Sequence, residues 1–217
     1  IVIDEEQRFG VEKREKMREK AMYNPAYVSM SATPIPRTLA SVIYGKNVDL
    51  FTIQSMPSGR KPVTTLYMKN KAIPRILIQE LLAGRQAYVI CPLIEDNPNS
   101  EVMANCISVE QVKQQYDRLL QNYGFKSETL TGKMSEKEML SVLNDFKTNK
   151  IQILISTTVV EVGVNNPNAT VIVIQNAERF GLSSLHQLRG RVRRGSYAPY
   201  CILQSEQEHN ERIEAMC

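Results

Sequence analysis

Apolar runs alternate with amphipathic runs along most of the chain. The runs at 87–94, 151–156 and 170–175 are almost continuously apolar, which is typical of strands buried on both faces of a parallel sheet. Elsewhere, apolar residues recur every three or four positions at 73–82 and 109–123, and this spacing predicts helices. The pattern therefore predicts an α/β fold in which helices flank a parallel sheet.

Two serines mark where helices are expected to begin. Ser108 precedes Gln111 by three residues, and Ser135 precedes Glu138 by three. Each pair forms a capping box, which satisfies free backbone groups at a helix start. The second of these helices is expected to end near Lys147. Three further elements are predicted, namely strands at 63–68 and 200–203 and a short helix at 182–192.

The first sixty residues carry a less regular pattern. The elements predicted there are short strands at 1–3, 27–30 and 48–53 and helices at 12–20 and 36–44. The stretch MPSGRKP at 56–62 is dense in Pro, Gly and Ser and is interpreted as a linker. We therefore predict a partial domain over 1–58 and a complete domain over 59–217.

Composition changes this picture little. Of 217 residues, 42% are hydrophobic and 23% charged, as in ordinary globular proteins, and no run approaches the ~20 apolar residues of a membrane span. The four cysteines form no CxxC pair and only two histidines occur, so we expect neither a zinc site nor a disulfide framework, and a reducing cytoplasm fits. The net charge of +4 is small, but arginines crowd one stretch and predict an anion-binding patch: Arg179, Arg189, Arg191, Arg193 and Arg194.

Two acids, Asp4 and Glu5, follow the first predicted strand. In parallel α/β sheets, ligands bind at the carboxyl ends of the strands. One carboxylate there can hold Mg²⁺ through water, and the next can orient or deprotonate an attacking water. An acid pair after a strand is also typical of a plain turn, and the pair alone does not decide between the two interpretations.

Three further segments carry candidate chemistry. SATPIPRT at 31–38 and ISTTVVEVGV at 155–164 place hydroxyls after predicted strands, where they can bind phosphates, although a helix start and a polar connection explain them too. In HQLRGRVRRG, Arg191 and Arg194 stand three apart and would share one helical face. A planar, permanently charged guanidinium suits the charge that develops on a phosphate; the alternative is a solvated basic helix.

Together these segments resemble the motor of superfamily two helicases. DEEQ resembles motif II, SATP motif III, TTVVEVGV motif V and QLRGRVRR motif VI. Longer strings, among them DEEQRFGV, SATPIPRTLA, PSGRKPVTT and GRQAYVICPLIE, resemble the RecG family of branch-migrating bacterial DNA helicases over nearly all of the chain. The resemblance implies a RecA-like fold: the tail of a first motor domain with motifs II and III, then a complete second motor domain with motifs IV, V and VI.

The resemblance also implies roles for residues of the first part. Asp4 would hold Mg²⁺ through water, Glu5 would activate the attacking water, and Gln7 would sense the nucleotide. A second group would couple hydrolysis to DNA movement: Ser31, Ala32 and Thr33.

In the second part, the resemblance points to the γ-phosphate of ATP and to DNA. Gln187, Arg191 and Arg194 would face the γ-phosphate, with one of the two arginines as the finger. Gly163 and Asn165 would lie at the nucleotide, although Asn165 stands where many relatives have aspartate. The DNA contacts would be Thr157, Thr158 and Arg193, with Gly163 touching or relaying to the DNA backbone; Arg193 stands where related motifs usually have glycine.

ATP and Mg²⁺ are the cofactors that the resemblance implies, branched DNA is the substrate, and single-stranded-DNA-binding protein is a candidate partner; no membrane is expected. Two alternatives stay open, the motor of a transcription-repair coupling factor and a non-catalytic nucleic-acid-binding module. No G-x-x-x-x-G-K-[ST] loop for phosphate binding occurs in these residues. We therefore expect a piece of a longer protein, without ATP turnover by itself.

Overall fold

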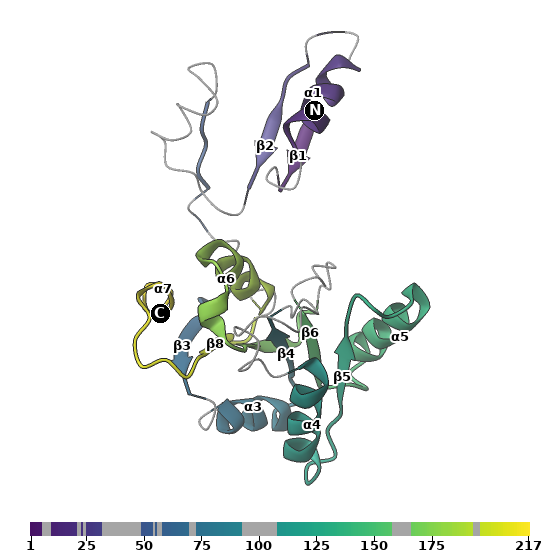
Figure 1. Cartoon of the computed structure of the whole chain (residues 1–217), viewed down its shortest axis with the longest axis vertical. Coiled ribbons are helices and arrows are strands. Elements are labelled where there is room, and N and C mark those ends of the chain that lie inside the picture. The colour runs from purple at the N-terminus through teal and green to yellow at the C-terminus, as the bar shows by residue number, and fades with distance from the viewer. Residues whose placement is uncertain are drawn as a thin grey trace, which may run out of the picture. The chain divides into compact units, whose positions relative to one another are not determined.

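The chain divides into two compact units, Ile1–Ser55 and Met56–Cys217 (Figure 1). The computed structural model describes residues 1–5, 10–20, 23, 25–31, 49–53, 55, 58–69, 73–92, 108–157, 166–192 and 196–217. The boundary expected after residue 58 lies close to this division. The assignment of the two units to two motor domains stays a prediction.

The first unit contains a pair of parallel strands, β1 (Val2–Asp4) and β2 (Val28–Met30). The helix α1 (Val11–Glu19) lies between them in sequence. The central residue of β1, Ile3, is buried, whereas Val2 and Val28 are exposed. These three elements agree with the strands and the charged helix expected from the sequence.

The strand expected at 48–53 is wrong over its described part, because residues 49–53 have no regular structure. Phe51 and Ile53 are 87% and 90% exposed, so the apolar side chains that suggested a strand are not buried. A strand needs a neighbour to pair with its backbone, and in the described part of this unit only β1 and β2 pair. The helix expected at 36–44 lies outside the described residues.

The second unit is built on a six-stranded sheet with the order β3-β8-β7-β4-β6-β5, in which all neighbours are parallel. Its strands are β3 (Thr64–Met68), β4 (Gln86–Cys91), β5 (Ser127–Leu130), β6 (Ile153–Thr157), β7 (Ala169–Ile174) and β8 (Tyr200–Gln204). Every residue of β4, β6 and β7 is buried. The apolar runs in the sequence correctly predicted these central strands, since a strand covered on both faces does not alternate apolar and polar residues.

Helices cover both faces of this sheet (Figure 1). On one face, α3 (Ile73–Leu82) and α4 (Val109–Leu120) pack on strand residues such as Val89 and Ile155. On the other face, α5 (Glu136–Lys147), α6 (Leu182–Arg189) and the short α7 (Glu211–Glu214) pack on residues such as Tyr88 and Leu154. Because successive strand residues point to opposite faces, each central strand contributes to two cores. Among the described residues, no helix has both the length and the apolar composition needed to cross a membrane.

Both capping boxes are confirmed. At α4, the Ser108 Oγ accepts the Gln111 backbone N–H at 3.2 Å, and Gln111 Oε1 accepts the Ser108 N–H at 2.9 Å. At α5, Ser135 Oγ accepts the Glu138 N–H at 3.3 Å and Glu138 Oε2 accepts the Ser135 N–H at 2.9 Å. Each box satisfies two backbone groups that a helix start otherwise leaves unpaired.

Replacing Ser135 with alanine is expected to lower the free energy of unfolding by about 1 kcal/mol, because the start of α5 loses its cap. Hydrogen bonds from Ser135 lower the pKa of Glu138. A carboxylate whose pKa is depressed by folding stabilises the fold above its unfolded-state pKa, and that contribution is lost as the pH falls through the folded-state value. The difference between the two proteins should therefore shrink in acid.

Chemical denaturation at neutral and acidic pH measures this difference. The matched control is Ser141→Ala, the same substitution at an exposed position inside the same helix, which is expected to be neutral or slightly stabilising. Equal losses for the two variants would contradict the capping argument.

The second unit also differs from the sequence prediction in places. The edge strand β5 was not expected, because its sequence SETL is mostly polar; pairing with β6 on its inner side stabilises it. The short α7 was also missed. The helix expected over 182–192 ends at Arg189, and Gly190–Val192 forms a tighter 3₁₀ turn, as is common at helix ends.

Candidate functional site

In the first unit, the two acids lie at the carboxyl end of a parallel strand pair, as expected. Asp4 pairs in register with Met30, so Ser31 follows at the end of the neighbouring strand. Glu5 has a left-handed backbone (φ 52°), and its N–H donates to Asp4 Oδ1 at 2.9 Å. This tight turn fixes the direction in which the chain leaves the sheet. Asp4 and Ser31 are exposed and Glu5 is half-buried.

The chemistry of this acid pair fits a magnesium ion that keeps most of its water. No group of three or more His, Cys, Asp or Glu side chains suited to a metal occurs among the described residues. Mg²⁺ commonly binds through one or two carboxylates plus waters and substrate phosphates, and an exposed aspartate beside a glutamate can supply that much. The other predicted residues of this unit, Gln7, Ala32 and Thr33, lie outside the described residues.

In the second unit, Thr157 is the last residue of β6 and is 8% exposed. It pairs in register with Cys91, the last residue of the central strand β4. Burial, the larger cause, and the nearby Glu110 raise the pKa of Cys91 to about 12, so its thiol stays protonated and supplies no nucleophile. The hydroxyl of Thr157 thus lies at the carboxyl edge of the sheet, the edge at which ligands bind in this architecture.

The connection that leaves Thr157 is anchored where it returns to the sheet. Gln86 is 1% exposed, and its side-chain amide donates to the carbonyls of Phe146 and Ile151 at 2.6 and 2.7 Å. Its Oε1 accepts hydrogen bonds from Asn166 and Asn168 at 3.0 and 3.1 Å. Because a buried network with every member paired is rigid, residue 166 has a fixed position. The predicted site residues Thr158, Gly163 and Asn165 lie between 157 and 166, outside the described residues.

The arginine-rich segment begins on α6 and ends in the 3₁₀ turn. Leu185 and Val192 are almost fully buried and attach this segment to the sheet. Gln187 and Arg191 are half-buried, so both side chains are partly open to solvent. Arg193 and Arg194 lie outside the described residues, and the expectation that the side chains of residues 191 and 194 share one helical face is therefore untested.

Arg189 helps to stabilise the fold. Its guanidinium donates to the Met216 carbonyl at 3.2 Å and lies 3.1 Å from His186 Nδ1. It thereby ties α6 to the residues that follow α7. The expected contribution of Arg189 to an anion-binding patch stays a prediction.

Residues 72–196 match the family model described as the helicase conserved C-terminal domain. The chain belongs to this helicase family. Over its full length, this helicase chain is 46% identical to the ATP-dependent DNA helicase RecG of Bacillus subtilis (strain 168) and to that of Staphylococcus aureus (strain NCTC 8325 / PS 47). It spans 31% of the length of each of these relatives.

A solved structure of RecG bound to a three-way DNA junction has the same fold. It matches 99% of the helicase chain and 27% of its own chain, with a TM-score of 0.67 and 35% identity. The predicted fold class, a RecA-like parallel sheet flanked by helices, is confirmed by this match together with the family model. The resemblance of the motifs to those of RecG is confirmed as well.

The helicase C-terminal domain also has polar residues at its carboxyl edge that were not predicted from the sequence. Gln175 follows β7, and its amide lies 3.4 Å from the Tyr116 hydroxyl. Asn176 has a left-handed backbone, and its N–H donates to Gln204 Oε1 at the end of β8 at 2.9 Å. These bonds fix the point from which the chain leads into α6. The signal in the sequence was the polar Gln-Asn pair directly after an apolar strand.

Proposed function

We propose that this chain is part of an ATP-dependent DNA helicase, and that the whole protein remodels branched DNA. The observation that supports this most strongly is the position of the helicase-like segments: each described one begins where a parallel strand ends or on the helix that follows. The full-length identity to proteins named RecG and the RecG structure with a three-way DNA junction favour branched DNA, such as stalled forks and Holliday junctions, as the substrate.

In this proposal, the first unit contributes carboxylates to ATP hydrolysis. Mg²⁺ bound with ATP would neutralise part of the phosphate charge. Asp4 would hold that ion through water, and Glu5 would orient the attacking water and accept its proton. Gln7 would sense the nucleotide. The segment Ser31–Thr33 begins beside Asp4 at the end of the paired strand, so a small shift of one strand end reaches the other, which is how hydrolysis would couple to DNA movement.

The second unit would contribute the arginine and the DNA contacts. Arg191 or Arg194 would stabilise negative charge on the transferred phosphoryl group, with Gln187 one turn earlier on α6. Gly163 and Asn165 would contact the nucleotide. Thr157, Thr158 and Arg193 would contact DNA phosphates, which position a strand without reading its sequence.

Single-stranded-DNA-binding protein is proposed as a partner, and the cytoplasm as the location. Both rest on the RecG resemblance. The domain assignment, with motifs II and III in 1–58 and motifs IV to VI in 59–217, has the same basis and is favoured by the nearby division between the two compact units.

The proposal is tested by ATP hydrolysis of the longer protein with forked DNA and with linear duplex of the same length and sequence. We expect strong stimulation by the fork and weak stimulation by the duplex. Equal stimulation by both would favour the transcription-repair coupling motor, and no hydrolysis with either would favour a non-catalytic nucleic-acid-binding module.

The 217-residue chain alone is expected to show no ATP turnover above a buffer blank, since its sequence contains no G-x-x-x-x-G-K-[ST] loop to hold the β- and γ-phosphates. Colorimetric phosphate release, with and without DNA, measures this. DNA-stimulated turnover that co-purifies with the chain over two columns would contradict the expectation.

A further inference from the structure

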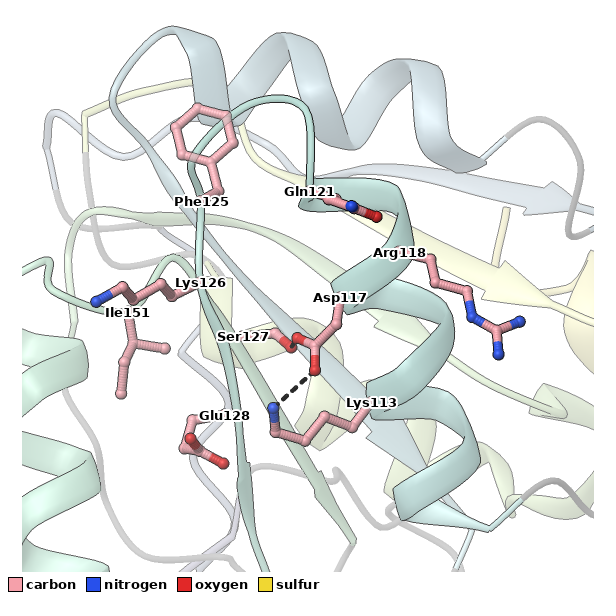
Figure 2. Close-up of a pocket in the computed structure, with 9 residues that line it drawn as sticks. All are labelled: Lys113, Asp117, Arg118, Gln121, Phe125, Lys126, Ser127, Glu128 and Ile151. Atoms are coloured by element: carbon pink, nitrogen blue, oxygen red, sulfur yellow. Dashed lines mark hydrogen bonds and ion pairs between the residues drawn. The ribbon is translucent and has the colours of Figure 1, made fainter.

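A pocket of about 540 Å³ lies at the other end of the second unit's sheet from Thr157 (Figure 2). It is formed by α4 from Lys113 onward, the segment that leads into β5, the first two residues of β5, and Ile151 just before β6. Because β5 and β6 are parallel and both begin here, this is the amino edge, whereas Thr157 lies at the carboxyl edge. None of the helicase-like segments contributes a lining residue.

The inner wall of the pocket is fixed and electrically balanced. Asp117 accepts hydrogen bonds from Lys113 Nζ at 2.8 Å and from Ser127 Oγ at 2.5 Å. Ser127 is 5% exposed and begins β5. The lysine and the aspartate neutralise each other, so a ligand would meet this wall as a rigid polar surface.

Two cations beside this wall have no ion pair within the described part of the chain. Arg118 and Lys126 are exposed, and Figure 2 shows their side chains projecting to opposite sides of the pocket. The remaining carboxylate, Glu128, accepts the Thr129 backbone N–H at 3.0 Å. Charges that flank a pocket without converging on one point suit a chain of anions better than a single phosphate or carboxylate.

Aromatic rings lie next to these cations. Tyr123 and Phe125 stack with ring centroids 6.3 Å apart and an angle of 8° between the planes. Tyr123 is 47% exposed, and Phe125 lines the pocket. Stacked aromatic rings beside cations are the combination that binds single-stranded nucleic acids, because bases stack on the rings while phosphates meet the charges.

An extended peptide fits this edge less well. Peptides that add to a sheet pair with the free backbone groups of its edge strand. Here the Thr129 N–H of the edge strand donates to Glu128, and a charged side chain on an edge strand discourages such pairing.

We infer that this surface binds a single strand of nucleic acid, with phosphates at Arg118 and Lys126 and a base on Tyr123. The choice of DNA as that nucleic acid rests on the proposed function. The surface adds a DNA contact on the amino edge, separate from the contacts proposed for the carboxyl edge. A branched substrate has several strands. A second binding surface would hold one of these strands apart from the strand bound at the carboxyl edge.

The test is binding of fluorescein-labelled oligo(dT) to the 217-residue chain by fluorescence anisotropy across a salt series. The double variant R118E/K126E is expected to raise Kd about tenfold or more and to flatten the plot of log K against log salt by about 1.4, since each contact with a single-stranded phosphate contributes ~0.7 to the slope. The control K61E/K137E changes the charge equally at two exposed positions, one before the opposite edge strand β3 and one in the first turn of α5, and should stay within about threefold of the parent, because distant charges are screened.

Tyr123→Ala tests whether a base stacks on this ring, and it does so without changing a buried residue. It is expected to raise Kd about tenfold for oligo(dT) and to leave binding of an abasic oligonucleotide unchanged. Competition by poly-glutamate distinguishes a nucleic-acid site from a site for an acidic peptide. Displacement of oligo(dT) by this peptide at equal charge, with Tyr123→Ala without effect, would show a generic anionic surface and overturn the inference.

The inference also fails if R118E/K126E binds like the parent, or if the chain binds no oligonucleotide. Neither result bears on the proposed function, which is tested by ATP hydrolysis of the longer protein. Conversely, if the longer protein shows no fork-stimulated hydrolysis, the oligonucleotide binding measured by anisotropy is still valid evidence for this surface.

Discussion

Replacing Arg191 with alanine is expected to lower the DNA-stimulated kcat for ATP hydrolysis of the longer protein by about 10³-fold or more, the scale of an arginine finger. Arg191 lies in the 3₁₀ turn after α6, and the adjacent Val192 is 2% exposed and holds that turn on the sheet. Arg191 is half-buried and belongs to a turn that the buried Val192 holds in place. Its charge would stabilise the phosphoryl group that leaves ATP.

Two further variants give this prediction its controls. Arg191→Lys keeps the charge but loses the planar pair of donors, and we expect most of the loss to remain. Arg189→Ala removes an arginine two residues away whose guanidinium donates to the Met216 carbonyl. That variant should lower stability by roughly 1–3 kcal/mol and should change kcat, measured where the protein is folded, far less than Arg191→Ala.

The expected loss should appear in kcat while ATP binding is kept, because a finger acts in the transition state. Steady-state kinetics and equilibrium binding of a fluorescent ATP analogue separate the two quantities. If Arg191→Ala hydrolyses ATP like the parent, residue 191 is not the finger. Arg194→Ala is then the next variant to measure.

Replacing Phe146 with alanine is expected to lower the free energy of unfolding of the chain by about 3–5 kcal/mol. Phe146 is 0% exposed, and its ring packs on Tyr88 with centroids 5.2 Å apart. Alanine would leave a cavity between α5 and the sheet, and cavities in a close-packed core are costly. The carbonyl of the same residue accepts a hydrogen bond from Gln86, so the cavity adjoins the polar network that anchors Asn166.

Urea denaturation followed by circular dichroism measures this loss. Leu140→Ala is the matched control, because Leu140 lies on the same helix and is 60% exposed; it should cost less than about 0.5 kcal/mol. A loss below 1 kcal/mol for Phe146→Ala would mean that α5 packs on the sheet less closely than the structure shows.

The central part of the fold could be predicted because its signals are local and strong. The middle of β6 and nearly all of β7 are apolar, and Ser108 and Ser135 each form a capping box with a residue three positions later, which predicts a helix start. The β5 strand could not be found this way, since its sequence SETL carries no apolar pattern. It forms because β6 offers it a partner, which is a tertiary effect.

The residues of the candidate site could also be predicted only in part. The acids at the end of β1 and the threonine at the end of β6 could be predicted, because polar residues directly after apolar strands are visible in the sequence. The role of Arg189 could not be predicted, because its partner Met216 is 27 residues further along the chain. Gln86 was missed for a similar reason, since its partners come from three separate segments.

Strand release from a labelled forked DNA by the longer protein distinguishes a branched-DNA helicase from both alternatives. We expect release that requires hydrolysable ATP, that is absent with linear duplex of the same sequence, and that is lost in Arg191→Ala while fork binding is kept. Release from the fork by Arg191→Ala at the parental rate, or release by the parent without ATP, would contradict this expectation.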